Sequence, residues 1–428
     1  MIKSGDSSKI PVVGFFPGFH SFGETYPLLK IAKCYNKLGG EVVIFSHGGE
    51  YEYMAKDFGY EIIKIEPELI EYQGRELIDY FLQNNDSDII RVIKNEASIY
   101  HKTGIQALVD TDIFFGCLFA PRVAKIPLIS IESYTRIPPF YTVGHSTFPD
   151  IYENYLTRLI PHYIKNRFFN WFFLNYKGLM MNKINRIAKK LDLDISFKRN
   201  RDIMVGDYTL VCDDIEFLDV KPTKDFPLDN YIGAILPDEN HINETNELDF
   251  DIEKHLQRPG KHILFTMGSS YKWKEIFLRI LKALNKTQYN VIATYSSILN
   301  ENELPNLNEN ILLKKFIYNI TSLNKRIDLS IIHGGRGTVY VTAHSGKPVI
   351  AIPLHAEQQG NLDSLIQHGS AIMLSKTFFK EKDLLNAIKR IFNNYDFYFH
   401  KAQLLSKKLP VPNGDKKAAK RILEIVTK

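Results

Sequence analysis

The N-terminal part of the chain alternates short apolar runs with longer amphipathic segments. Short β-branched and aromatic runs bounded by glycine or polar residues predict buried strands, and apolar residues at helical spacing predict a helix over Thr25–Leu38, ended by Gly39 and Gly40. Strands that alternate with helices indicate βαβ units and a parallel sheet. The strands predicted in this part are Ile10–Phe16, Glu41–Ser46, Ile62–Ile65, Ile113–Phe119 and Leu128–Glu132.

The same alternation restarts after a polar connector. The stretch 219–260 holds several prolines and the acidic, Asn-rich run Asp238–Asp251, a composition that buries little and suits a link between domains. The strands predicted beyond it are Ile263–Met267, Asn290–Thr294, Leu329–His333, Val349–Ile352 and Ala371–Leu374. The pattern therefore predicts an α/β fold with two Rossmann-like, doubly wound domains facing a central cleft, where ligands bind at the carboxyl ends of the strands.

Composition restricts the class of protein. The 428 residues suit two or three domains. The formal net charge of +5 is small for this length and does not indicate a nucleic-acid partner. The three cysteines, Cys34, Cys117 and Cys212, form no C-x-x-C pair, so they predict neither disulfides nor a zinc site. With no apolar segment typical of a signal peptide or a membrane span, we expect a cytoplasmic protein.

The loop from His333 to Thr338, with the sequence His-Gly-Gly-Arg-Gly-Thr, carries the clearest chemical signal. It follows a predicted buried strand and opens a helix that ends near Gly346. Glycines let the backbone approach a ligand, and the free amides and positive end of a helix attract phosphate oxygens. The loop therefore predicts a diphosphate cradle, although it is neither a Walker loop nor a G-x-G-x-x-G loop. The alternative is a plain tight turn between strand and helix.

Further elements after this loop extend the pattern over residues 331–374. They are Gly346-Lys-Pro, Pro353, Glu357-Gln358, Asn361 and Gly369. Together with the loop they resemble the donor signature of family 1 glycosyltransferases, which include plant and animal UDP-glycosyltransferases as well as the sterol and antibiotic glycosyltransferases that are nearest in motif. The resemblance implies the two-domain GT-B fold and a nucleotide-diphosphate sugar as donor substrate, with no cofactor.

The resemblance also assigns donor-binding residues. His333 would contact the diphosphate, Gly335, Gly337 and Thr338 would bring backbone and hydroxyl donors to it, and Gly268-Ser269 would touch the same group. Glu357 and Gln358 would hold sugar hydroxyls, and Phe316 would stack on the base. The alternatives are a core-edge histidine at 333, an ordinary helix start at 357–358 and a buried core residue at 316.

One position departs from the family pattern. Many members carry a glutamate eight residues after the signature histidine to bind the ribose, and this chain has Val341 there. Sterol and antibiotic glycosyltransferases also often lack this acid, so the resemblance holds but this position does not identify the base or the ribose. We expect UDP as the nucleotide and keep dTDP as the alternative.

The catalytic base is expected in the loop 17–27 after the first strand. Family members usually have Gly-His-x-x-Pro here, whereas this chain has Gly23-Glu24-Thr-Tyr-Pro, which places Glu24 where the histidine would be. A carboxylate in a water-poor cleft can remove the acceptor hydroxyl's proton, so Glu24 is the first candidate and His20 the second. Their alternatives are a carboxylate favouring a helix N-terminus and a packed loop histidine. No metal site is expected, because no Asp-x-Asp motif lies near the donor loop.

Residues 138–191 leave the strand–helix rhythm. They include the aromatic run Phe168–Phe173, flanked by Lys165, Arg167 and Lys177. Such a segment can line a pocket for a lipophilic acceptor, and it suggests a peripheral membrane contact through 165–177. The alternative is a helix that is apolar nearly all round and packs against the sheet.

The predicted organisation is an acceptor-binding domain over 1–240, a donor-binding domain over 241–400 and a terminal helix within 401–428 that returns to the first domain. The predicted function is an inverting, metal-independent hexosyltransferase that uses a UDP-sugar or dTDP-sugar and a small-molecule or lipid acceptor. The alternatives are a GT-B sugar-nucleotide epimerase, which needs no acceptor, and a non-catalytic nucleotide-sugar binding subunit.

Overall fold

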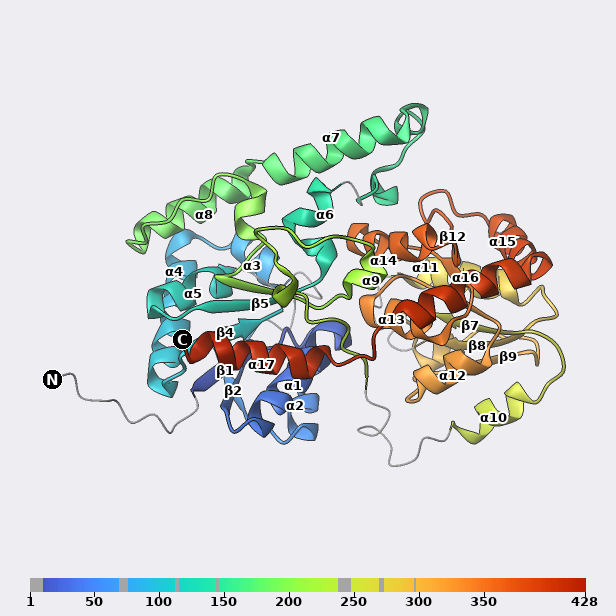
Figure 1. Ribbon diagram of the computed structural model, residues 1–428, viewed down its shortest axis with the longest axis horizontal. Helices are drawn as coiled ribbons and strands as arrows, with labels where there is room; N and C mark the ends of the chain where they lie inside the picture. The colour runs from blue at the N-terminus through green and yellow to red at the C-terminus, as the bar shows by residue number, and fades with distance from the viewer. Residues whose placement is uncertain are drawn as a thin grey trace.

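Two parallel sheets organise the chain (Figure 1). The computed structural model describes residues 11–68, 76–111, 115–143, 146–237, 248–268, 273–295 and 298–428. Within these residues the strand orders are β3-β2-β1-β4-β5-β6 and β12-β11-β10-β7-β8-β9. The two orders are equivalent. The strand order reverses next to the first strand of each sheet, which is between β1 and β4 in the N-terminal sheet and between β7 and β10 in the C-terminal sheet. This confirms two Rossmann-like doubly wound sheets.

The strands are short and mostly buried on both faces, as parallel strands covered by helices are. In the first sheet they are β1 Val12–Phe16, β2 Glu41–Ser46, β3 Ile62–Lys64, β4 Ala107–Asp110, β5 Leu128–Glu132 and β6 Tyr208–Val211. In the second they are β7 His262–Thr266, β8 Asn290–Thr294, β9 Ile311–Lys314, β10 Leu329–Ile332, β11 Val349–Ala351 and β12 Ala371–Met373.

Helices cover both sheets. The N-terminal helices are α1 Phe22–Lys37, α2 Tyr53–Asp57, α3 Glu76–Gln83, α4 Asp86–Thr103, α5 Phe115–Ala124, α6 Pro138–Thr142, α7 His162–Asn175, α8 Leu179–Lys190 and α9 Ile215–Leu218. The later ones are α10 Phe250–Leu256, α11 Lys274–Leu284, α12 Ile320–Arg326, α13 Arg336–Ser345, α14 Ala356–Gln367, α15 Glu381–Asn393, α16 Tyr395–Lys408 and α17 Gly414–Val426. No helix among the described ranges has the length and hydropathy that crossing a membrane requires.

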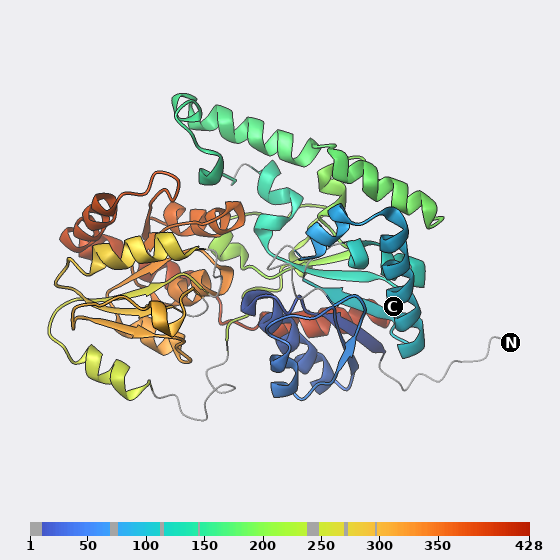
Figure 2. The same ribbon diagram turned by 180° about the vertical axis from the view of Figure 1, so that it is seen from behind.

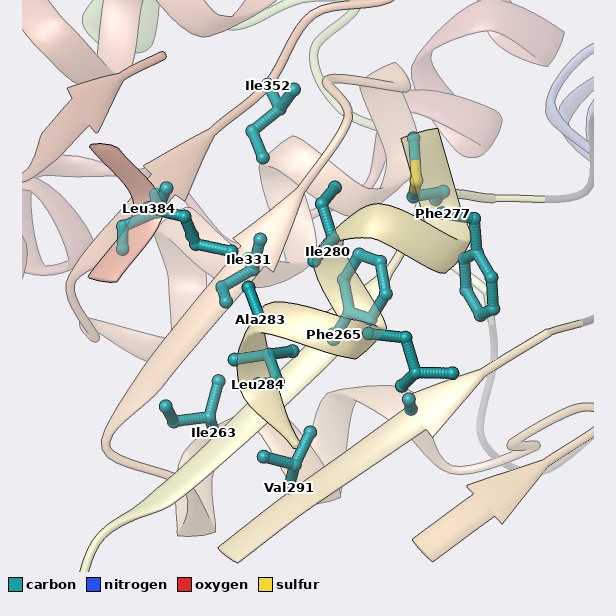
Figure 3. Close-up of a cluster of buried hydrophobic side chains, with 14 of the residues drawn as sticks. Ile263, Phe265, Phe277, Ile280, Ala283, Leu284, Val291, Ile331, Ile352 and Leu384 are labelled. Atoms are coloured by element: carbon teal, nitrogen blue, oxygen red, sulfur yellow. The ribbon is translucent and has the colours of Figure 1, made fainter. Parts of the chain in front are cut away.

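The C-terminal core illustrates why these segments fold as they do. Every residue of β7 is buried, and α11 places apolar side chains at helical spacing against it. Figure 3 shows Phe265 of β7 and Ile331 of β10 in one cluster with Phe277, Ile280 and Leu284 of α11. Burying a side chain of this size contributes about 1.5–3 kcal/mol, so the cluster fixes the sheet that carries the donor loop.

The predicted strand at 113–119 is wrong. The strand is β4, which ends at Asp110, and Phe115–Ala124 forms α5. A fully apolar run does not distinguish a buried helix from a buried strand. Helix α5 is buried because it packs on α4. The packing is close, since a Cβ added at Gly116 of α5 would lie 2.5 Å from Glu96 Oε1 of α4.

The chain returns to the N-terminal domain at its end. Helix α16 lies on α13, whereas α17 lies against α1 (Figure 1), where Asp415 accepts a hydrogen bond from Cys34 Sγ at 3.3 Å and faces Lys30 Nζ at 3.8 Å. The predicted domain limit near 240 lies outside the described residues, and residue 400 falls inside α16. The exact limits stay a prediction.

Candidate active site

A cavity of about 440 Å³ lies between the two domains. It opens where the strand orders reverse, at the carboxyl ends of β1, β4 and β5 on one side and of β7 to β10 on the other, as expected for doubly wound sheets. The predicted site residues that line it are His20, Glu24, Gly268, Phe316, His333, Gly335, Gly337, Thr338, Glu357 and Gln358. Ser269 lies outside the described residues. Loops about 300 residues apart in sequence thus form one site.

The donor loop has the geometry of an anion-binding helix start. It leaves β10 at Ile332, turns at Gly334 with a φ of 101° and enters α13 at Arg336. The N-cap residue Gly335 offers no side chain to the first amides of α13, so these amides remain for a ligand in the cavity. The helix ends at Gly346, whose φ of 65° closes the last turn. The predicted loop and helix are confirmed.

The imidazole of His333 is held between two glycines. A Cβ at Gly268 or at Gly335 would lie 2.7 Å from His333 Nε2, so neither position leaves room for a side chain. Burial, together with the nearby His355, lowers the pKa of His333 to about 4, although the backbone of Thr266 opposes this shift. The ring is therefore neutral at pH 7. Within the described part of the chain its Nδ1 is buried without a hydrogen-bond partner, so the ring can serve an oxygen-rich ligand by hydrogen bonding.

The first turn of α14 forms another side of the cavity. Gln358 Oε1 accepts a hydrogen bond from the Leu354 amide at 3.0 Å, which leaves its NH₂ group for a ligand. Glu357 lies beside it and near the buried guanidinium of Arg336. These groups supply both donors and acceptors for a polyol, and they also begin a helix, so both interpretations of this dipeptide fit the structure.

Phe316 is not a core residue. Its side chain is 45% exposed, and its ring centroid lies 6.3 Å from that of Phe22 across the domain boundary and 5.0 Å from that of Tyr318. The buried-core interpretation is therefore wrong, and the ring can offer a flat face to a base. Val341 also lines the cavity and brings no carboxylate there.

Both candidate bases face the same cavity from the N-terminal domain. Glu24 lies in the first turn of α1, and Ser21 Oγ donates a hydrogen bond to Glu24 Oε2 at 3.1 Å. His20 lies in the loop that precedes this helix. Glu24 satisfies both interpretations, since it stands at a helix N-terminus and borders the cavity.

Sequence reasoning missed other cavity residues. Arg136 lines the cavity just after β5, with its Nε 3.5 Å from Glu132 Oε2 and its Nη1 donating to the Thr111 carbonyl at 3.4 Å. Thr111, directly after β4, also lines it. Positions that follow the carboxyl end of a strand in a doubly wound sheet are the signal that would have found both.

A buried polar network joins the domains beside the cavity. Arg336 of α13 donates to Cys212 Sγ and lies near Asp213, which accepts hydrogen bonds from the Tyr134 amide at 2.7 Å and Ser133 Oγ at 3.3 Å. Burial raises the pKa of Asp213, while Arg336 opposes that rise. These residues were missed because β6, which leads to Asp213, was not predicted.

Asn361 of α14 adds a second link between the domains. Its Oδ1 accepts from Ser133 and Thr135, both at 3.4 Å, and its Nδ2 donates to the Gly334 carbonyl at 3.1 Å. The position of the donor loop therefore depends on the N-terminal domain.

In the ranges that the structure describes, no group of three or more His, Cys, Asp or Glu side chains is arranged to hold a metal ion. Metal independence stays a prediction.

Comparison with known proteins agrees with this geometry. Residues 262–422 match the family model of the glycosyltransferase family 28 C-terminal domain. UDP-glucuronosyltransferase 2B15 of Rattus norvegicus is 28% identical over 204 residues, which cover 45% of this chain and 35% of that protein. 2-Hydroxyacylsphingosine 1-beta-galactosyltransferase of Homo sapiens is 26% identical over 240 residues, 55% of this chain and 42% of that protein. The chain thus spans less than half the length of these two relatives.

Solved structures extend the likeness to the whole fold. The spinosyn forosaminyltransferase SpnP superposes with a TM-score of 0.67 at 15% identity, covering 98% of this chain and all of that one. The glycosyltransferase VinC, solved in complex with DTDP, gives 0.64 at 13% identity, with 97% and 99% covered. The fold is therefore GT-B, and the resemblance to family 1-like GT-B glycosyltransferases is confirmed.

Proposed function

We propose that the protein is an inverting hexosyltransferase that moves a sugar from a nucleotide diphosphate to a hydroxyl of a lipophilic or small-molecule acceptor, without a metal ion. The observation that carries the proposal is the single cavity that has the glycine-rich loop after β10 on one side and two candidate bases on the other.

Direct displacement fits this arrangement. The acceptor hydroxyl would lie on the N-terminal side, where Glu24, or His20 in second place, removes its proton as the bond to the sugar forms. The diphosphate would leave on the opposite side, where the amides of α13 and the neutral imidazole of His333 stabilise its charge. Attack from one side and departure on the other inverts the anomeric carbon.

The donor site supports a nucleoside diphosphate. Phe316 offers the base a face, Gly268 and the loop His333–Thr338 offer the diphosphate a cradle, and Glu357 with Gln358 face the sugar. UDP remains the expected nucleotide, in keeping with the names of the curated relatives, and dTDP is the alternative, in keeping with the DTDP bound to VinC.

The acceptor side supports a lipophilic substrate. The aromatic excursion 138–191 begins two residues after Arg136, which lines the cavity, and one relative is named for 2-hydroxyacylsphingosine. We also propose a cytoplasmic location with a peripheral membrane contact around 165–177.

The proposal is tested by nucleotide release from a panel of UDP-sugars and dTDP-sugars, with and without lipid extract. We expect acceptor-dependent release that collapses in Glu24→Gln and His333→Ala, and that persists in the control Glu41→Gln, an exposed carboxylate at the opposite end of the sheet. Donor binding without release would indicate a binding subunit. Interconversion of the donor sugar without an acceptor would indicate an epimerase.

A further inference from the structure

Helix α7 carries a large apolar surface that no other part of the described chain covers. Figures 1 and 2 show α7 and α8 along one edge of the molecule, with α7 reaching from the N-terminal domain towards α14. We define the α7 outer face as six exposed side chains on α7 and on the 3₁₀ helix η4 (Thr157–Leu159) and the residue before it. Each of these side chains is between 47% and 81% exposed. They are Leu156, Leu159, Tyr163, Phe168, Trp171 and Phe172.

The inner face of α7 already makes its contacts with the protein. Phe173 stacks on Tyr141 of α6 with ring centroids 4.7 Å apart, and Phe169 meets Phe148 edge-on at 5.7 Å. Lys165 is buried and paired with Glu153, so it points inward and not towards solvent. The alternative of a helix that is apolar nearly all round and packs against the sheet is therefore wrong, because α7 packs on α6 and its outer aromatics stay exposed.

The segment before α7 is fixed to the donor domain. Thr147 Oγ1 donates to Asp363 Oδ2 of α14 at 2.6 Å, and Gln359 accepts from the Asp150 amide at 2.7 Å. The Thr377 amide donates to the Asp150 carboxylate at 2.9 Å. The α7 outer face is thus held in place from both domains, and an anchored surface of this kind can dock without first being ordered.

Charge indicates what covers this face. Residues 154–178 contain no aspartate or glutamate. Arg158, Arg167 and Lys177 are exposed there. A symmetric contact with a second copy would place this cationic segment against itself, with no acid to compensate it. Aromatic side chains among cations instead match the boundary of an anionic bilayer, where Trp and Tyr gather and basic residues meet lipid phosphates.

We propose that the α7 outer face docks on the surface of an anionic lipid bilayer, with the helix axis in the plane of the membrane. The consequence for catalysis rests on the proposed function. Tyr141, stacked under α7, donates its hydroxyl to the Thr135 carbonyl at 3.3 Å, and the next residue, Arg136, lines the cavity. Docking would therefore hold the acceptor side of the cavity close to the lipid from which an acceptor enters.

Vesicle flotation of the full chain tests the docking. We expect binding to vesicles that contain phosphatidylglycerol with phosphatidylcholine, weaker binding at high salt, and little binding to phosphatidylcholine alone. Binding independent of lipid charge and salt would overturn the inference.

Tryptophan fluorescence locates the contact. The chain has two tryptophans, Trp171 and Trp273, so Trp273→Phe leaves the outer-face indole as the only reporter. Its emission should shift to the blue with anionic vesicles and be quenched by brominated lipid. An unchanged spectrum while the protein floats with the vesicles would place the contact elsewhere and refute the inference.

Substitutions measure the contribution of the face. Trp171→Ser and Phe172→Ser should each weaken vesicle binding about tenfold. Arg167→Glu should weaken it by at least about fivefold, whereas Phe397→Ser, an exposed aromatic on α16, should leave it unchanged. Equal binding by all four variants would refute the inference.

Two further readouts separate the possible failures. If light scattering shows that the wild type is a dimer and that Trp171→Ser is a monomer without vesicles, the face is a self-interface and the inference is wrong. UDP binding should persist in every docking variant and fall in His333→Ala. Docking without nucleotide binding would refute the proposed function and leave the membrane inference standing.

Discussion

The His333 ring lies in the space that a side chain at Gly335 would fill. The substitution Gly335→Ala therefore tests whether the position of this ring matters for nucleotide binding. The backbone of Gly335 has a φ of −58° and a ψ of 132°, which alanine adopts without strain. Any effect of Gly335→Ala therefore comes from the added Cβ, which would lie 2.7 Å from His333 Nε2.

The size of the effect follows from this distance. Ordinary van der Waals contact begins at 3.4 Å, so the ring has to move by 3.4 − 2.7 = 0.7 Å. Gly268 limits movement on the other side, because a Cβ there would also lie 2.7 Å from the ring. Overpacking of this kind costs about 1–3 kcal/mol of folding free energy. A binding group displaced by most of an ångström also loses its alignment with the ligand, and we expect nucleotide affinity to fall about tenfold or more.

Calorimetric titration with UDP and dTDP and thermal unfolding measure the two effects. Gly337→Ala is the control for stability, since a Cβ there meets nothing within 4 Å and alanine favours the helix by about 1 kcal/mol. In a His333→Ala background, Gly335→Ala should cost almost nothing, because the clash is gone. If Gly335→Ala unfolds and binds nucleotide like the wild type, the ring is not confined between the two glycines and the reasoning fails.

Three further predictions concern titration, the base and the nucleotide. Burial raises the pKa of Asp363 to about 7 from 3.8, so the stability that its protonated form provides is lost as pH rises from about 4 to 7. The variant Asp363→Asn can keep the hydrogen bond from Thr147. It should stabilise the protein by at most about 4 kcal/mol at pH 8 and hardly at all at pH 4, which denaturant unfolding measures. Equal effects at both pH values would contradict this prediction. Glu24→Gln should lower turnover by about 10²–10⁴-fold with donor affinity unchanged, and a larger loss in His20→Asn than in Glu24→Gln would transfer the role of base to His20. Phe316→Ala should weaken nucleotide binding by about 1–3 kcal/mol, and an unchanged dissociation constant would place the base elsewhere.

The elements that the sequence predicted well are those whose signal is local. Asn290–Thr294 forms β8 as predicted, because a short β-branched run flanked by polar residues favours a buried strand. The loop at His333 was recognisable because strand, glycines and helix follow one another within a few residues. The strands β6 and β9 were not predicted, although the shorter strands β11 and β12 were, so length alone does not explain the difference.

What the sequence by itself determined is therefore the α/β alternation, the donor loop and the identity of the candidate base loop. Only the tertiary structure decided which distant groups meet, such as Arg336 with Cys212 across the domains, and which face of an apolar helix stays uncovered, as at Trp171. The physical reason is that backbone periodicity and glycine geometry act within one or two turns of chain. Burial and charge pairing instead depend on side chains that arrive from other segments, and no local pattern records them.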